Sequence, residues 1–230
     1  MDIQNRIALV TGAGEGTGRA IGERLAAGGA AVALTDVSGA EETLAGIRAA
    51  GGRAASVPAD LTSPDGVRRA VDFAVDTFGG LDILVNNAGG IPYRTPGYPV
   101  ADPTDWVGVL DLNLRAPLLA IQAGLPTLAD GGGVVVNIGS TAGLGDAPYH
   151  SPEYGAAKAG LMRATACLGD LPGVRVNCVA PGWIATDRAL ASLAPGDEAP
   201  PVSLGALCDA VVDLVADESA RGKVVVLTRG

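Results

Sequence analysis

The feature that most constrains the fold of this chain is an alternation of short apolar runs with longer helical stretches along its length. Each apolar run has the length of a buried strand. A strand followed by a crossover helix and a second strand gives a parallel sheet with helices on its faces. The apolar runs lie at residues 6–10, 30–36, 53–58, 81–85, 134–138, 174–179 and 223–228, and the helical stretches at 17–27, 40–50, 64–78, 102–129, 153–168 and 203–216.

This order predicts an α/β fold of the Rossmann-like, doubly wound kind, with a seven-stranded parallel sheet flanked by helices on both faces. Hydrophobic residues make up 48% and charged residues 18% of the 230 residues, which is the balance of a chain with a large core. No linker-like change of composition and no internal repeat interrupts it. We therefore expect a single domain over residues 1–230, with a short proline-rich substrate loop near residues 187–202.

Charge and composition argue against several kinds of partner. The chain has 16 Lys and Arg against 25 Asp and Glu, a formal net charge of −9, whereas nucleic-acid binding needs a concentrated positive field. No apolar run approaches the roughly 18 residues of a membrane span, and the first residues do not resemble a secretory signal. Three widely spaced cysteines and a single histidine do not make a metal site. We expect a cytoplasmic protein with no metal and no nucleic-acid or membrane partner.

The first strand leads directly into a glycine-rich turn and then into an alanine-rich helix. The turn reads T-G-x-x-x-G-x-G, with Gly12, Gly16 and Gly18 at the defining places. Glycines let the backbone approach a ligand closely, and the N–H groups at the helix start attract negative charge. The context suits a pyrophosphate site, although a structural turn in a glycine-rich chain is the alternative.

Asp36 ends the second strand about 20 residues after Gly16, the offset expected of an acidic residue that binds a ribose diol. A carboxylate there accepts hydrogen bonds from the ribose hydroxyls of NAD and repels the 2′-phosphate of NADP. Glu15 adds a second negative charge nearby, and no Arg or Lys follows Asp36 until Arg48. We predict NAD as the cofactor; the alternative is that Asp36 is an ordinary turn residue.

Tyr154 and Lys158 stand four residues apart in a helical stretch, so their side chains share one face. A nearby cation stabilises a phenolate, which makes tyrosine a usable acid and base near neutral pH. Ser140 follows the fifth strand at the sheet edge where ligands of such folds bind, and its hydroxyl is suited to hold a carbonyl oxygen. Asn113 lies between two leucines in a helical stretch, where its amide needs a partner; a structural role is an equally good interpretation.

Together these motifs resemble the short-chain dehydrogenase/reductase family, and the similarity extends from Arg6 to about Gly222. The order and approximate spacing of all the motifs carry the resemblance. They are the glycine turn, Asp60-Leu61, Asn86-Asn87-Ala88-Gly89, Asn113, Ser140, Tyr154-x-x-x-Lys158 and Asn177-x-x-x-Pro181-Gly182.

The resemblance implies a catalytic group of Asn113, Ser140, Tyr154 and Lys158. Tyr154 would exchange the proton with the substrate oxygen, Ser140 would hydrogen-bond that oxygen, Lys158 would lower the pKa of Tyr154 and bind the nicotinamide ribose, and Asn113 would anchor a water. It also implies a homodimer or homotetramer. The implied cofactor-binding residues are Gly12, Glu15, Gly16, Thr17, Gly18, Asp36, Asp60, Leu61, Asn87, Tyr154, Lys158, Ile184 and Thr186.

The expected function is that of an NAD-dependent oxidoreductase that transfers a hydride between nicotinamide and a small-molecule secondary alcohol or ketone. Two alternatives stay open: an NADP-dependent reductase of the 3-ketoacyl type, and a non-catalytic dinucleotide-binding sensor. Further side chains near the motifs are candidates either for the substrate site or for loop packing: Tyr93, Tyr98, Tyr149, His150 and Trp183.

Overall fold

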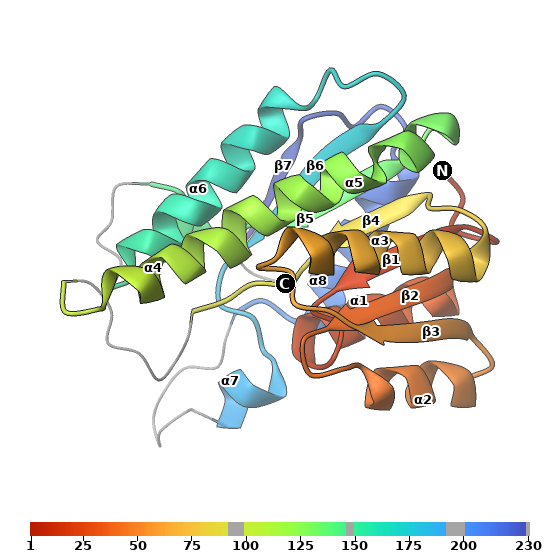
Figure 1. Cartoon of the computed structure of the whole chain (residues 1–230), viewed down its shortest axis with the longest axis horizontal. Coiled ribbons are helices and arrows are strands. Elements are labelled where there is room, and N and C mark those ends of the chain that lie inside the picture. Colours follow the sequence, from red (N-terminus) through yellow and green to blue (C-terminus); the bar gives the residue numbers. More distant parts are fainter. Residues whose placement is uncertain (92–98, 146–149, 192–200, 229–230) are drawn as a thin grey trace.

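The computed structural model describes residues 1–91, 99–145, 150–191 and 201–228, and within these residues the strands form one seven-stranded sheet. All neighbouring strands are parallel, in the order β3-β2-β1-β4-β5-β6-β7 (Figure 1). The predicted α/β fold is confirmed. The strands are β1 (Ile7–Thr11), β2 (Ala31–Asp36), β3 (Arg53–Pro58), β4 (Ile83–Asn86), β5 (Val134–Ile138), β6 (Arg175–Pro181) and β7 (Val224–Leu227).

Helices cover both faces of the sheet because side chains along each strand alternate between two cores. Ala8 and Val10 of β1 belong to the core under α1 (Gly16–Ala27), α2 (Glu41–Ala49) and α8 (Leu204–Ala216). Leu9 belongs to the core under α3 (Pro64–Phe78) and α5 (Ala116–Asp130). On that second face α6 (Pro152–Cys167) packs on β6, where Met162 meets Cys178. In the described ranges, no helix has the length and apolarity needed to cross a membrane.

The helix predicted over residues 102–129 differs from the observed structure in its middle. It is divided into α4 (Pro103–Leu110), a π-helical segment η1 (Asp111–Arg115) and α5. The side-chain amide of Asn113 donates to the carbonyl oxygen of Val109, one turn earlier, and so competes for an acceptor of the helical ladder. A local widening of this kind is typical of functional sites. The pattern also did not predict two short elements, the 3₁₀ turn η2 (Thr141–Gly143) and helix α7 (Asp187–Ala191).

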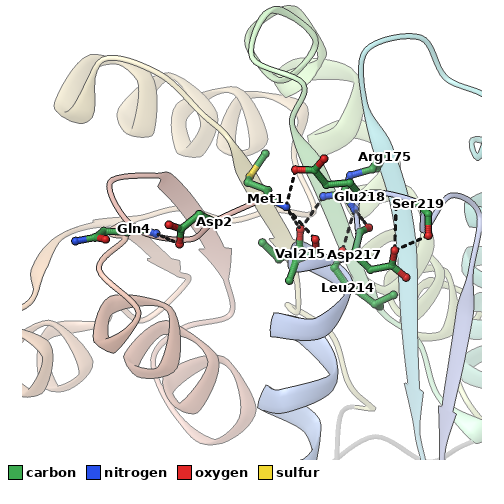
Figure 2. A network of polar contacts seen from close by, with 10 residues as sticks. Met1, Asp2, Gln4, Arg175, Leu214, Val215, Asp217, Glu218 and Ser219 are labelled. Atoms are coloured by element: carbon green, nitrogen blue, oxygen red, sulfur yellow. Dashed lines mark hydrogen bonds and ion pairs between the residues drawn. The ribbon is translucent and has the colours of Figure 1, made fainter.

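A buried arginine from β6 caps the C-terminal end of α8. The Arg175 guanidinium donates to the carbonyl oxygens of Leu214 at 2.9 Å, Val215 at 2.8 Å and Asp217 at 2.9 Å, and the Met1 amino group donates to Ala216 O at 2.9 Å (Figure 2). These are carbonyls that an isolated helix end leaves unpaired. The cations therefore stabilise the negative end of the helix dipole.

The strand order determines where a ligand can lie. From β1 the chain first proceeds outward through β2 and β3, then returns to place β4 on the other side of β1. Connections after β1 and β4 consequently diverge and leave a crevice beyond the carboxyl ends of these strands. In open α/β sheets this switch point is the usual ligand site.

Candidate functional site

A cleft of about 910 Å³ opens at this switch point. It is lined by segments that follow strands β1 to β6, together with the start of α6. The sequence-predicted residues that line it are Gly12, Glu15, Gly16, Thr17, Gly18, Asp36, Asp60, Leu61, Asn87, Ser140, Tyr154, Lys158, Ile184 and Thr186. Asn113 is the predicted site residue that does not line the cleft.

The glycine turn has a backbone that larger residues would not fit. Gly12 and Gly16 have φ angles of +63° and +52°, in the left-handed region. A Cβ atom on Gly12 would lie 2.8 Å from the Cα of Ala88, and one on Gly18 would overlap the carbonyl oxygen of Gly12. The turn therefore keeps bare backbone at the start of α1, a cradle that fits a phosphate group.

Neighbouring side chains hold this turn in place. The Asn87 amide donates to the carbonyl oxygens of Thr11 at 2.9 Å and Gly12 at 3.0 Å. The Thr43 hydroxyl donates to Ala13 O at 2.7 Å. Asn87 thus lines the cleft while its amide supports the turn. The Thr11 hydroxyl, which the motif contains but the sequence reasoning did not single out, accepts from the N–H groups of Asn87 and Ala88 at 3.0 Å each.

Two carboxylates lie at the end of the cleft formed by β2 and β3. Asp36 accepts hydrogen bonds from the N–H of Gly14 at 3.1 Å and from the N–H of Ser38 at 3.1 Å, so its carboxylate is fixed against the glycine turn. Asp60 accepts from the hydroxyl of Thr62 at 2.7 Å and from its N–H at 2.9 Å. Both hydrogen bonds lower the pKa of Asp60, and the bond from the hydroxyl has the larger effect. This end of the cleft is therefore acidic.

Lys158 lies at the other end of the cleft and is only 3% exposed. Its Nζ donates to Ile138 O at 2.8 Å and lies 5.6 Å from the centroid of the Tyr154 ring. Burial lowers the pKa of Lys158 from 10.5 to about 8. Because that value is still above neutral pH, a mostly protonated ammonium stands beside the phenol ring, where its charge favours the phenolate form.

Ser140 reaches the cleft because β5 ends just before it. Its Oγ accepts from the N–H of Ala142 at 3.1 Å and so caps η2. Tyr154 reaches the cleft from the first turn of α6. A hydroxyl, a phenol and an ammonium therefore line one cavity, which is a set of groups suited to exchange a proton with a substrate oxygen.

Asn113 is fully buried and stabilises the loop after β4. Its Oδ1 accepts from Gly90 N at 2.9 Å, and its Nδ2 donates to the carbonyl oxygens of Gly90 and Val109, both at 2.9 Å. A Cβ atom on Gly89 would lie 2.6 Å from the Asn113 Oδ1 and 3.2 Å from the Lys158 Nζ. One glycine therefore separates the buried amide from the buried ammonium.

Sequence reasoning missed two cations of the cleft, Arg19 and Arg188. Arg19 donates to Gly14 O at 2.9 Å and pairs with Glu42 at 2.8 Å. Arg188 extends from α7 and pairs with Glu15 at 3.2 Å. Neither belongs to a spacing motif, and the Glu15 pairing joins segments far apart in the chain. No local sequence signal identifies them.

The remaining candidates for the substrate site lie outside the cleft lining or outside the described residues. Trp183 is 50% exposed and His150 is exposed. Tyr93, Tyr98, Tyr149 and residues 192–200 of the expected substrate loop lie outside the described residues. Within the described ranges, no group of three or more His, Cys, Asp or Glu side chains is arranged to hold a metal ion.

Comparisons with known proteins find similar sequences and structures over most or all of the chain. A family model described as short chain dehydrogenase matches residues 6–194. A cis-4-hydroxycyclohexanecarboxylate dehydrogenase of Sinomonas cyclohexanicum is 39% identical over 198 residues, covering 84% of this chain and 78% of that enzyme. A cyclohexanol dehydrogenase of an Acinetobacter species is 36% identical over 189 residues, covering 79% of this chain and 74% of that enzyme. A short chain dehydrogenase structure from Burkholderia cenocepacia, in complex with NADP, has a TM-score of 0.91 and 35% identity and covers 100% of this chain and 99% of that one.

Proposed function

Because this chain belongs to the short-chain dehydrogenase/reductase family, we propose that it is an NAD-dependent oxidoreductase that transfers a hydride between nicotinamide and a secondary alcohol or ketone. One observation carries the proposal: the buried ammonium of Lys158 lies 5.6 Å from the Tyr154 ring, in the same cleft as the glycine turn and Asp36. Burying a charge costs free energy. Beside the Tyr154 ring the ammonium favours the phenolate form, which a non-catalytic protein that uses Lys158 only to bind the cofactor ribose does not require.

The cleft residues fit a nicotinamide dinucleotide at both ends. The bare backbone of the glycine turn would hold the pyrophosphate at the start of α1. Asp36, already fixed by the Gly14 N–H, would accept hydrogen bonds from the adenosine ribose hydroxyls. When bound, the cofactor supplies the hydride acceptor for oxidation or the hydride donor for reduction.

The side chains at the Lys158 end would handle the proton. In the oxidation direction the Tyr154 phenolate takes the proton of the substrate hydroxyl, and in reduction the Tyr154 hydroxyl returns a proton to the carbonyl oxygen. The ammonium of Lys158 stabilises the phenolate between these events. The Ser140 hydroxyl donates to the substrate oxygen and stabilises the charge that develops there.

Asn113 would complete this group as a positioning residue. The family resemblance assigns it a water that relays protons to Lys158. Its contacts support a role behind the cleft wall, because its amide holds Gly90 through two hydrogen bonds of 2.9 Å. Gly89, which lines the cleft, is thereby kept against the Lys158 ammonium.

The preference for NAD rests on Asp36. An ionised carboxylate at the ribose end repels the 2′-phosphate of NADP. The Burkholderia relative, whose structure contains NADP, has the same fold. The fold therefore does not distinguish the two cofactors, and the proposed preference depends on the charge of Asp36. Dissociation constants from NADH and NADPH fluorescence test it. We expect the unsubstituted protein to bind NADH at least tenfold more tightly than NADPH. Asp36→Ser should reduce this difference between the two dissociation constants. Equal dissociation constants for NADH and NADPH in the unsubstituted protein would contradict the preference.

Turnover is tested by the appearance of NADH absorbance across secondary alcohols and 3-hydroxyacyl thioesters. The panel begins with cyclohexanol, because of the names of two relatives. Tyr154→Phe is expected to lose turnover and to keep NADH binding within about threefold, since the ring remains and only the acid/base group is removed. Turnover retained by Tyr154→Phe refutes the assignment of the acid/base. Silence across the panel together with clear NADH binding favours the sensor alternative.

The same family grounds lead us to propose that residues 1–230 act as one domain in a homodimer or homotetramer. Light scattering of the purified protein measures the assembly, and a monomeric mass contradicts it.

A further inference from the structure

Helix α7 contacts the glycine turn through side chains, although the two segments are far apart in the sequence. In Figure 1, α7 stands apart from the helices that cover the sheet. The Thr186 hydroxyl accepts from the Ala189 N–H at 3.2 Å and so begins α7, and a Cβ atom on Gly16 would lie 3.5 Å from the Cγ2 of Thr186. An ion pair also connects the two segments: Arg188 Nη1 lies 3.2 Å from Glu15 Oε1. Both residues line the cleft.

The position of Glu15 raises an electrostatic difficulty. It is the residue immediately before α1, where the first N–H groups of the helix would receive a phosphate, and its side chain makes no capping hydrogen bond. A carboxylate at this place repels a pyrophosphate, because like charges this close disfavour each other. Some nearby cation must offset it if an anionic ligand is to bind.

Arg188 is suited to be that cation. Three cations line the described cleft: Arg19, Lys158 and Arg188. Lys158 is buried at the Tyr154 end. The Arg19 guanidinium contacts Gly14 O and Glu42 of α2, so it lies between the glycine turn and α2. Arg188 is 67% exposed at the side chain and already lies against Glu15. A guanidinium has five donors in a planar fork, so it can hold a carboxylate and a phosphate oxygen together.

We propose that Arg188 binds the pyrophosphate of the dinucleotide from α7, opposite the start of α1, and that Glu15 is a positioning residue that holds the guanidinium over the glycine turn. The inference rests on the proposed function, because it takes the ligand to be a dinucleotide. It adds a binding contact that no spacing motif of the sequence contains.

The two residues are expected to respond differently to substitution, whereas a purely structural ion pair would lose the same contact in either variant. Arg188→Gln removes the cation and leaves the Glu15 carboxylate beside the pyrophosphate, so we expect the NADH dissociation constant to rise about tenfold. Glu15→Gln removes the repulsion along with the positioning contact, and is expected to change it by less than about threefold. The double variant should bind NADH more tightly than Arg188→Gln alone, because no uncompensated carboxylate remains.

The matched control is Arg24→Gln on α1. Arg24 also pairs with an acidic residue, Asp209 at 2.7 Å, and is similarly exposed, but it does not line the cleft. It is expected to leave NADH binding unchanged. Thermal unfolding without ligand checks that each variant is folded, and titration with ADP-ribose and with adenosine separates the phosphate contact from the adenosine contact. Arg188→Gln should weaken ADP-ribose and spare adenosine.

Two outcomes overturn the inference. The first is that Glu15→Gln raises the NADH dissociation constant as much as Arg188→Gln does and that the double variant has the same dissociation constant as either. The ion pair would then only stabilise the position of α7. If Arg188→Gln binds NADH as the unsubstituted protein does, Arg188 does not contact the pyrophosphate. Failure of the proposed function looks different, because then the unsubstituted protein itself binds neither NADH nor ADP-ribose.

Discussion

Replacing Lys158 with methionine is expected to stabilise the protein while abolishing turnover. The reason is the cost of burying the ammonium, which lowers the Lys158 pKa from 10.5 to about 8. At about 1.4 kcal/mol per pKa unit, this lowering corresponds to roughly 3 kcal/mol of unfolding free energy lost at pH 7. Methionine has a similar length without the charge. It forfeits the hydrogen bond to Ile138 O, worth about 1 kcal/mol, so the net gain is about 2 kcal/mol.

The pH dependence identifies the cause of this gain. Below pH 8 the lysine is charged in both the folded and unfolded states, so the penalty is fully present. Between pH 8 and 10.5 the folded protein has lost the proton and the unfolded chain still holds it, so the stability of the unsubstituted protein rises with pH. Lys158→Met has no such group. Its advantage should therefore shrink through this window.

Urea unfolding at several values between pH 7 and 10.5 measures the difference. Lys223→Met is the matched control, because Lys223 is the other lysine of the chain and its side chain is 55% exposed. It should change stability by less than about 0.5 kcal/mol with no trend across the window. A Lys158→Met advantage that is absent at pH 7, or that stays constant up to pH 10.5, refutes the desolvation explanation.

Two further predictions concern the backbone and the core. Gly18→Ala is expected to raise the NADH dissociation constant more than tenfold and to lower stability by about 1–3 kcal/mol, because its Cβ would overlap the Gly12 carbonyl oxygen; Gly108→Ala, where nothing lies within 4 Å, is the neutral control. Arg175→Met should lower the free energy of unfolding, measured by urea unfolding, by about 2–4 kcal/mol. The reason is that the carbonyl oxygens of two α8 residues and of the C-cap residue lose their hydrogen-bond donor. Arg221→Met removes a single bond of 3.2 Å and should cost less than about 1 kcal/mol; equal losses for both variants contradict this explanation.

The parts of the fold that depend only on residues close together in the sequence could be predicted from the sequence. The run Val134–Ile138 is apolar except for Asn137 because both faces of this parallel strand are buried, and a run of this kind can be recognised in the sequence without knowledge of the neighbouring strands. The glycine turn and Asp36 are equally local, since each is placed by the end of its own strand. The glycine turn and Asp36 both line the cleft, as do the other cofactor residues that the family resemblance implies.

The helix over residues 102–129 shows where local information ends. Its hydrophobic pattern indicates one helix, and nothing in that pattern specifies the π segment at Asp111–Arg115. The segment accompanies a contact between Asn113 and Gly90 from the loop after β4, and whether an amide finds such a partner depends on packing. The sequence left a structural and a catalytic role for Asn113 equally open for the same reason.

By itself, the amino-acid sequence determined the order of strands and helices along the chain, the bare backbone of the glycine turn and the placement of Tyr154 and Lys158 on one face of a helix. These features follow from periodicity and from residues within one turn of each other. The tertiary structure alone decided that Lys158 is 3% exposed, that Asn113 lies behind the cleft wall, and that Arg188 meets Glu15. Burial and charge pairing depend on distances between segments remote in the chain, and only the packed fold fixes those distances.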